Sequence, residues 1–166
     1  KDNHILVIGK TEGHLSQTIF AREILSEKKG PPPEINLFNE KNNGEIVSKI
    51  IKENLIESCN DISLGGILIA IAKMCIKGKK GAKLNSIKGL TNKYEYFFGE
   101  DQGRYIIEVK KENLKKVNEI LKTNAVHYDE IGIVTDKNLS YNNELKIPIE
   151  ELNKAYTNWL PNYMSN

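Results

Sequence analysis

Hydrophobic and polar residues follow one another along this chain in blocks that predict short strands and amphipathic helices. A run of apolar residues at 4–9, ending at a glycine, predicts a buried strand. Similar runs predict further strands at residues 58–63, 82–84, 105–109 and 131–134, and a hairpin at 139–141 and 145–149. Apolar residues three or four positions apart predict helices at residues 15–26, 39–57, 67–77, 112–122 and 150–159.

Single residues set the expected ends of several helices. Asn39 is a candidate N-cap, because its side chain can accept a hydrogen bond from a free N–H group in the first turn. The three prolines at 31–33 must end the preceding helix, since proline lacks a backbone donor and fixes an extended backbone. Pro161 is expected to stop the last helix in the same way.

The order of these elements predicts an α+β fold. Strands and helices do not alternate with regular crossover spacing, so we expect a mixed β-sheet flanked by helices rather than a doubly wound sheet. The length of 166 residues fits a single domain spanning 1–166, with 150–166 as its C-terminal helix and tail. The chain passes from Lys1 almost directly into a strand, which suggests a segment of a longer protein.

Composition and charge exclude several classes of partner. With 39% hydrophobic and 28% charged residues, the chain has the composition of a soluble globular protein. A net charge of +2 gives no electrostatic footprint for nucleic acid or an anionic membrane. The longest apolar stretch, 66–76, is too short to span a bilayer and contains Lys73. We therefore expect a cytoplasmic protein with no membrane or nucleic-acid partner.

The cysteines and histidines predict neither a metal site nor a nucleophile. Cys59 and Cys75 lie in predicted buried elements, where isolated reduced thiols are a better interpretation than a disulfide. Neither has a cysteine or histidine at metal-ligand spacing, and the three histidines are scattered. No Ser/His/Asp or Cys/His order is present, so we expect no catalytic residue and no metal ligand in this chain.

One candidate for ligand binding lies where a strand leads into a helix, at Asp61, Ser63, Gly65 and Gly66. Two glycines let a ligand approach the backbone, and a helix N-terminus offers free N–H groups to an anion. Ser63 could hold a phosphate oxygen, and Asp61 a ligand hydroxyl or a hydrated magnesium ion. The alternative is a capped helix whose glycines permit close packing.

A second candidate is the polar loop before the strand at 105–109, with Glu100, Asp101, Gln102 and Arg104. The two carboxylates and the amide could clamp a ligand, and the arginine could contact a phosphate. The alternative is a surface turn in which Arg104 pairs with one of the acids. The aromatic cluster at 94–98 is interpreted as core or interface packing rather than as a platform for base stacking.

Several of these segments together resemble one known family. The motifs are a strand ending in glycine, a Gly-x-Leu-x-x-Ser/Thr-like helix start, a proline-rich stretch, Asp-Ile-Ser-x-Gly-Gly, Phe-Gly-Glu-x-x-x-Arg, Ile-Gly-x-Val, and a helix that reaches Trp and Pro. They occur here in that order at residues 5–9, 13–18, 30–37, 61–66, 98–104, 131–134 and 159–161. The chain resembles the phosphoribosylformylglycinamidine synthase family, specifically the C-terminal domain of its second half. That domain belongs to the aminoimidazole ribonucleotide synthase-related C-terminal domain superfamily.

The resemblance implies part of a purine-biosynthesis ligase. That enzyme converts formylglycinamide ribonucleotide, ATP and glutamine-derived ammonia to formylglycinamidine ribonucleotide, ADP and phosphate. It implies ATP and Mg²⁺ as cofactors of the full enzyme, with no cofactor held tightly here. It also implies the remaining domains of the enzyme and a glutaminase subunit or domain as partners. The chain alone is expected to be inactive, and to self-associate through an apolar face left by the aromatic cluster and the apolar helices.

Two departures weaken the transfer of function. The family's histidine before Asp61 is Asn60, and its acid after Ser63 is Leu64. This predicts that the segment 61–66 is mainly structural here. Alternatives are a related ATP-using synthase or kinase of the same superfamily, or a stand-alone nucleotide-binding module.

Overall fold

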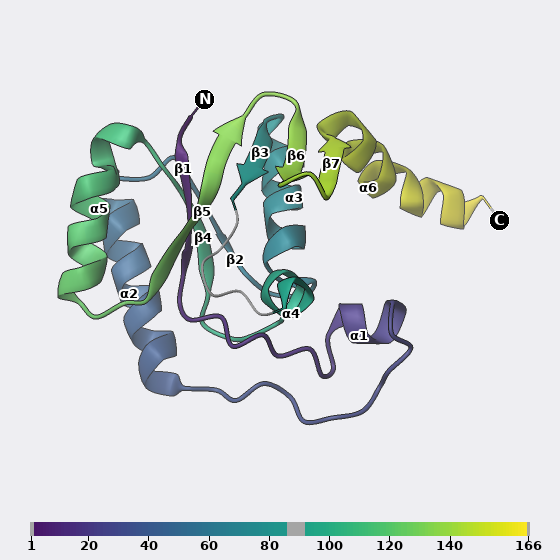
Figure 1. Cartoon of the computed structure of the whole chain (residues 1–166), viewed down its shortest axis with the longest axis horizontal. Helices are drawn as coiled ribbons and strands as arrows, with labels where there is room; N and C mark the ends of the chain where they lie inside the picture. Colours follow the sequence, from purple (N-terminus) through teal and green to yellow (C-terminus); the bar gives the residue numbers. More distant parts are fainter. Residues whose placement is uncertain (1, 86–91, 166) are drawn as a thin grey trace.

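A computed structural model describes residues 2–85 and 92–165, in which a seven-stranded sheet lies between two layers of helices (Figure 1). The strands are β1 (His4–Ile8), β2 (Ser58–Asp61), β3 (Gly81–Leu84), β4 (Tyr105–Val109), β5 (Tyr128–Thr135), β6 (Asn138–Tyr141) and β7 (Leu145–Pro148). The helices are α1 (Ile19–Glu23), α2 (Leu37–Lys52), α3 (Gly66–Gly78), α4 (Lys93–Phe98), α5 (Lys111–Thr123) and α6 (Ile149–Met164).

The sheet is mixed, which confirms the predicted α+β class. Its strand order is β2-β4-β1-β5-β3-β6-β7. The β3–β6 pair is parallel, and the other pairs are antiparallel. The predicted hairpin is the antiparallel pair β6–β7. The sheet therefore has β2 and β7 as its edges, with β1 and β5 near its centre.

Alternate residues of each central strand feed two separate cores, because successive side chains of a strand point to opposite faces. In β1, Leu6 and Ile8 pack with α2 and α5, whereas Ile5 and Val7 pack with α3 and α4. Figure 1 shows these two pairs of helices on opposite sides of the sheet. At sheet ends, loops between the two layers are brought together, and this is where the candidate site lies.

Several helix ends differ from those expected. The N-cap of α2 is Asn36, whose side chain accepts from the N–H of Asn39, so the helix begins before the predicted cap. The helix predicted at 15–26 is shortened to α1. Gln17 and Ser26 have positive φ, which interrupts the helix on both sides, and Thr18 caps its N-terminus. α6 continues through Pro161 and does not stop there. Proline has no backbone N–H, so the carbonyl four residues before Pro161 lacks its helical donor, and at this exposed turn it can accept a hydrogen bond from water.

The aromatic cluster at 94–98 forms helix α4, which the sequence analysis left without a helix. Tyr96 and Phe97 are buried in the core beside α3, and Phe98 stacks on Phe20. The packing interpretation of the cluster is thus confirmed. Tyr96, Phe97 and Phe98 thus pack within the domain, whereas Tyr94 is 50% exposed and stacks on Phe20.

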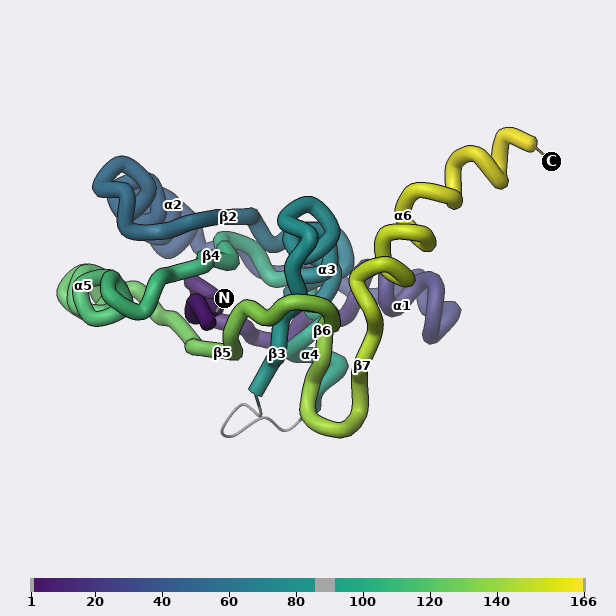
Figure 2. Tube along the Cα trace, turned by 90° about the horizontal axis from the view of Figure 1, so that it is seen from above, coloured from purple at the N-terminus to yellow at the C-terminus, as the bar shows by residue number. Residues whose placement is uncertain are grey.

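Exposed apolar side chains lie at the start of α2, at Ile35, Leu37 and Phe38, and along α6, which projects from the body of the domain (Figure 2). Its first turn packs on the core through Ile149 and Leu152. Further along the helix Trp159 is 65% exposed and Tyr163 68% exposed, and their rings stack at 5.5 Å. Among the described residues no helix is both long and apolar enough to cross a membrane.

The two thiols are free and lie on opposite faces of the sheet. Cys75 belongs to the core under α3, and Cys59 packs against the core under α2 and α5. The prediction of unpaired cysteines is confirmed. Burial raises the pKa of Cys59 to about 11 and the pKa of Cys75 to about 12, and the charges of Asp61 and Glu108 act in the same direction.

Both thiols are therefore expected to react slowly in the folded protein. At pH 8 a pKa raised by two or three units lowers the thiolate fraction by about 100-fold to 1,000-fold, and only the thiolate is nucleophilic. Reaction with a chromogenic disulfide should be slow in the native state and fast in denaturant, with Cys59→Ser and Cys75→Ser separating the two rates. Fast native reaction of either thiol at pH 8 would contradict the burial described here.

The same shifts predict the direction of a pH effect on stability. Below about pH 9 the thiols are protonated in both the folded and the unfolded chain, so their contribution to the stability of the folded state is fully present. As pH rises toward about 11 and 12 the unfolded chain loses these protons before the folded one, so stability falls.

Candidate phosphate-facing site

The two candidate loops lie at the same end of the sheet. β2 runs antiparallel to β4 with Asp61 opposite Tyr105, so the loop that follows β2 is beside the loop that precedes β4. Together they line a cavity of about 240 Å³, whose walls are formed by Glu40, Asp61, Ile62, Ser63, Leu64, Glu100, Gln102, Gly103, Arg104 and Tyr105. Both loops thus open onto one cavity.

The glycine pair allows the start of α3 to touch another backbone segment. Gly66 has φ of +70°, and a Cβ there would lie 2.7 Å from the carbonyl oxygen of Phe97 and 2.8 Å from that of Gly99. The Gly66 N–H donates to the Ser63 carbonyl at 3.0 Å. The close-packing interpretation of these glycines therefore describes what they do in the fold.

Glu100 supplies a negative charge at the N-termini of two helices. Its Oε1 accepts hydrogen bonds from the N–H of Gly65 at 2.8 Å and from the N–H of Ile19 at 2.9 Å. These donors belong to the starts of α3 and α1, where backbone N–H groups favour an anion. The Gly65 N–H group, which the sequence analysis proposed as a phosphate donor, thus donates to the Glu100 carboxylate of the chain itself.

Asp101 organises a neighbouring loop in the same manner. Its two carboxylate oxygens accept from three consecutive backbone N–H groups, those of Glu12, Gly13 and His14, at 3.0–3.1 Å. The side chain is 7% exposed. Hydrogen bonds to a carboxylate stabilise its charged form, so the loop at 12–14 is fixed by charge-assisted bonds.

Arg104 is buried among these loops, with 1% of its surface exposed. Its guanidinium donates to the Asp101 carbonyl at 3.1 Å, the Thr11 hydroxyl at 3.1 Å and the Gly99 carbonyl at 2.7 Å. One of its nitrogens also lies 3.7 Å from the Asp101 carboxylate. Burial lowers the pKa of Arg104, and the Asp101 charge opposes that shift.

This pairing of Arg104 with Asp101 matches the turn alternative, except that the turn is buried rather than on the surface. The guanidinium holds three backbone or side-chain oxygens of the site, so its main role in this fold is to position the loops. A contact from Arg104 to phosphate stays a prediction.

Asp61, Ser63 and Gln102 are the predicted residues whose side chains remain exposed beside the cavity. They can accept or donate hydrogen bonds to a ligand, but they contain neither a strong nucleophile nor a paired general base. In the described ranges 2–85 and 92–165, no three His, Cys, Asp or Glu side chains gather as a metal site would require. The described side chains therefore do not by themselves form a binding site for a resident Mg²⁺ ion.

Sequence analysis missed two residues that support the loops. Asn43 of α2 is buried and donates to the Gly103 carbonyl at 2.9 Å, and Thr11 accepts from Arg104. A signal was present for Asn43, since it precedes Ile46, Val47 and Ile50 on the apolar face of the same helix. A polar residue on such a face needs a partner, whereas nothing in the sequence marks Thr11.

The fold and these loops define a mixed-sheet α+β domain, and the comparison with known proteins gives its family. The family profile described as "AIR synthase related protein, C-terminal domain" matches residues 1–141. The chain belongs to this family. The profile ends at β6, so β7 and α6 lie outside it.

Two curated relatives of this chain are subunits of the same enzyme. The chain is 59% identical over 165 residues to the phosphoribosylformylglycinamidine synthase subunit PurL of Pelagibacter ubique, and 38% identical over 164 residues to that of Bartonella bacilliformis. These matches cover 99% and 98% of this chain, and 23% and 22% of the relatives. The chain thus spans about a quarter of the length of these relatives.

Solved structures share the fold. PurL of Thermotoga maritima complexed with FGAR superposes with a TM-score of 0.71 at 21% identity, covering 92% of this chain and 28% of that one. The same protein complexed with ATP gives 0.67 at 19% identity, with 92% and 26% covered.

Proposed function

We propose that this chain is the C-terminal part of a phosphoribosylformylglycinamidine synthase. The observation that carries the proposal is the 59% identity with the Pelagibacter ubique subunit along nearly the whole chain. In the proposed reaction ATP phosphorylates the amide oxygen of formylglycinamide ribonucleotide, and glutamine-derived ammonia then displaces phosphate. The enzyme would act in purine biosynthesis in the cytoplasm.

Within that enzyme we assign two roles to the eight predicted site residues. Asp61, Ser63 and Gln102 present polar atoms to the cavity and would face a phosphate group. Glu100, Asp101 and Arg104 hold the loops, and Gly65 and Gly66 allow the close packing that places them. The ATP complexes of the Thermotoga maritima protein support a nucleotide as the ligand of the whole enzyme. Mg²⁺ would be held outside this chain.

The remaining domains of the enzyme are the proposed partners, together with a glutaminase. The length of the relatives supports the first, and the PurLQS assembly of Thermotoga maritima supports a multi-subunit enzyme. The ammonia delivered by the glutaminase would reach catalytic groups in those other domains. This chain alone is expected to have no synthase activity.

A domain exchange tests the proposal. The matching quarter of the Pelagibacter ubique subunit is replaced by this chain, and ATP- and ammonia-dependent formation of formylglycinamidine ribonucleotide is measured. We expect activity within about tenfold of the parent, a loss of about 1.4 kcal/mol at most in transition-state stabilisation. The matched control carries the Thermotoga maritima domain, which shares the fold at about 21% identity, and should be much less active. A folded chimera without activity would contradict the proposal.

The chain by itself is expected to form dimers through α6. Residues 155–166 contain no charged side chain, so two copies of this helix can approach without repulsion. Its exposed Trp159 and Tyr163 are of the residue types enriched at protein interfaces. In a solution of the chain alone, we expect this neutral, aromatic face of α6 to bind the same face of a second copy.

Sedimentation velocity over a concentration series measures this association. Replacing Trp159 and Tyr163 together by serine should weaken the dimer by about tenfold or more, since aromatic residues dominate interface energetics. Ile51→Ser is the control, because Ile51 is also an exposed apolar residue but lies on α2. A monomer at high micromolar concentration, or equal effects of both changes, would rule out α6 as the interface.

A further inference from the structure

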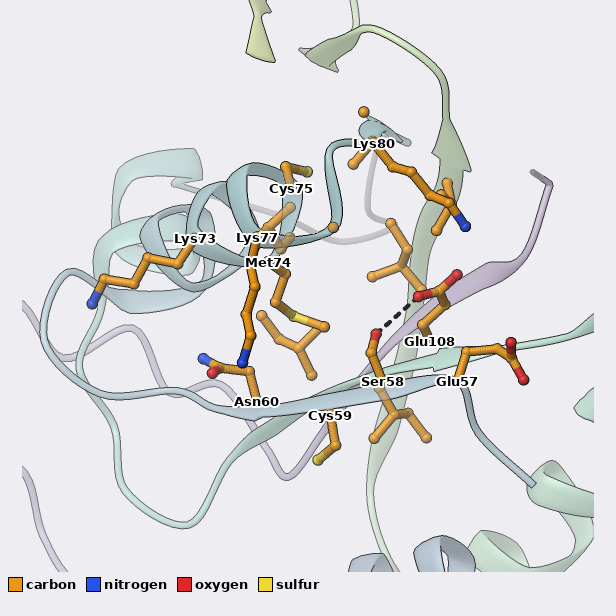
Figure 3. Close-up of a pocket in the computed structure, with 18 residues that line it drawn as sticks. Glu57, Ser58, Cys59, Asn60, Lys73, Met74, Cys75, Lys77, Lys80 and Glu108 are labelled. Carbon is orange, nitrogen blue, oxygen red and sulfur yellow. Dashed lines mark hydrogen bonds between the residues drawn. The ribbon is translucent and has the colours of Figure 1, made fainter. Parts of the chain in front are cut away.

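A second cavity, which shares no lining residue with the candidate site, lies under the C-terminal half of α3 (Figure 3). It measures about 450 Å³, within the range of small-molecule sites. Its walls come from the last two turns of α3, from the edge strand β2 and from the strands beside it. The phosphate-facing cavity lies at the N-terminal end of α3, so no residue of α3 lines both cavities.

The cavity lies where the C-terminal half of α3 faces the edge strand β2 and the strands beside it. Ser58 and Asn60 of β2 pair with Glu108 and Ile106 of β4, and paired residues share a face of the sheet. Ile106 is buried under α3, so the short polar side chains of β2 also face that helix. They are too small to fill the space beneath it.

The floor of the cavity is apolar. Ile5, Ile106 and Val134 of the sheet and Ile71 of α3 are buried residues that line it. The Met74 side chain extends from α3 toward the sheet in Figure 3, into the space between them. An apolar group of a ligand would therefore find a hydrocarbon surface at this floor.

The two carboxylates at the cavity are already satisfied. Glu57 forms an ion pair with Lys110 at 2.9 Å. The oxygens of Glu108 accept from Asn3 at 2.7 Å and from Ser58 at 2.8 Å. These contacts link the segments around β1, β2 and β4, and both carboxylates already have partners within the chain.

The remaining charges at the cavity are positive. Lys73, Lys77 and Lys80 line its mouth, all three exposed. In the described part of the chain none of the three forms an ion pair, whereas other surface lysines such as Lys93 and Lys116 do. In Figure 3 the Lys77 side chain reaches across the opening toward Asn60. An apolar floor below a rim of unpaired ammonium groups suits a ligand with an apolar body and an anionic head.

We propose that this cavity binds an amphipathic organic anion, with its apolar body on the apolar floor and its anionic head attracted by the positive charges of Lys77 and Lys80, which lie at opposite sides of the opening (Figure 3). The inference does not depend on the enzyme to which the chain belongs. Exposed ion pairs add little each, and about ten ligand atoms are buried at most, so affinity should be weak, about 0.1–1 mM.

Three probes with the same apolar body test the proposal: octanoate, 1-octanol and octylammonium, each titrated into the protein while amide shifts are recorded. Octanoate should shift amides of residues 58–60 and 73–81, with octanol weaker and octylammonium at least about fivefold weaker than octanoate, because like charges repel at the rim. Equal affinity for the three head groups, tighter binding of octylammonium, or shifts confined to α6 would overturn the proposal.

Variants separate the head-group contact from the floor. Lys77→Gln with Lys80→Gln should weaken octanoate binding about threefold to tenfold and leave octanol unchanged. The matched control, Lys115→Gln with Lys154→Gln, removes the same charge from α5 and α6 and should change neither. Met74→Trp should weaken both ligands by filling the space. Because the lysines are exposed, their replacement should not prevent folding, and unchanged octanoate binding in that variant would refute the role of the rim.

Discussion

Replacing Arg104 with methionine is expected to destabilise the domain by about 3–5 kcal/mol, the cost of removing one partner from a buried, hydrogen-bonded charge pair. Methionine keeps much of the apolar volume but removes all the donors. The carbonyls of Gly99 and Asp101 and the hydroxyl of Thr11 would then lose their bonds to the guanidinium. The buried Asp101 carboxylate would lose the nearby positive charge.

Urea denaturation followed by circular dichroism measures this loss. Arg22→Met is the matched control, because the same change at an exposed position of α1 should cost less than about 0.5 kcal/mol. Arg104→Lys should recover only part of the stability, since an ammonium group cannot reproduce the planar set of donors. Equal stability of Arg104→Met and Arg22→Met would mean that the guanidinium does not hold the loops.

Replacing Gly66 with alanine is expected to cost about 3 kcal/mol or more. Part of the cost is conformational, because φ is +70° at this residue, where a Cβ is strained by about 1–2 kcal/mol. The larger part is steric. The added methyl group would lie 2.7–2.8 Å from backbone atoms of Phe97, Phe98 and Gly99, which cannot rotate away as a side chain could.

Gly78→Ala provides the control for this change within the same helix. A Cβ at Gly78 meets nothing within 4 Å, and alanine is the better helix former by up to about 1 kcal/mol. Thermal unfolding of the two variants should therefore shift in opposite directions, or Gly78→Ala should be neutral. If Gly66→Ala unfolds like the unchanged protein, the contact between α3 and the 97–99 segment is looser than described here.

The sequence by itself determined the α+β class and most of the elements. Residues 4–9 have the apolar run of a central strand, residues 105–109 are apolar except for Glu108, and the helix at 112–122 has one apolar face, so local pattern was enough to place them. Helix ends were less certain. Asn36 and Asn39 are equally good caps by residue type, and only the tertiary path of the chain after the prolines selected Asn36.

The eight residues proposed for the candidate site were also predicted from sequence, because their types are unusual next to a strand end. Their functions within the site were decided by tertiary structure. Glu100 could have faced a ligand, but the antiparallel pairing of β2 with β4 brings its carboxylate to the start of α3. Whether a charged side chain meets solvent or another segment depends on distant residues, and no local pattern encodes that distance.

Two features were accessible only from the assembled fold. The cavity under α3 arises because the short polar side chains of the edge strand β2 face that helix, a result of strand order rather than of any local motif. The exposed face of α6 likewise depends on where that helix leaves the sheet, since its apolar pattern alone would predict burial. The hydrophobic pattern determines which residues can pack together, and the order of strands in the sheet decides which of them do.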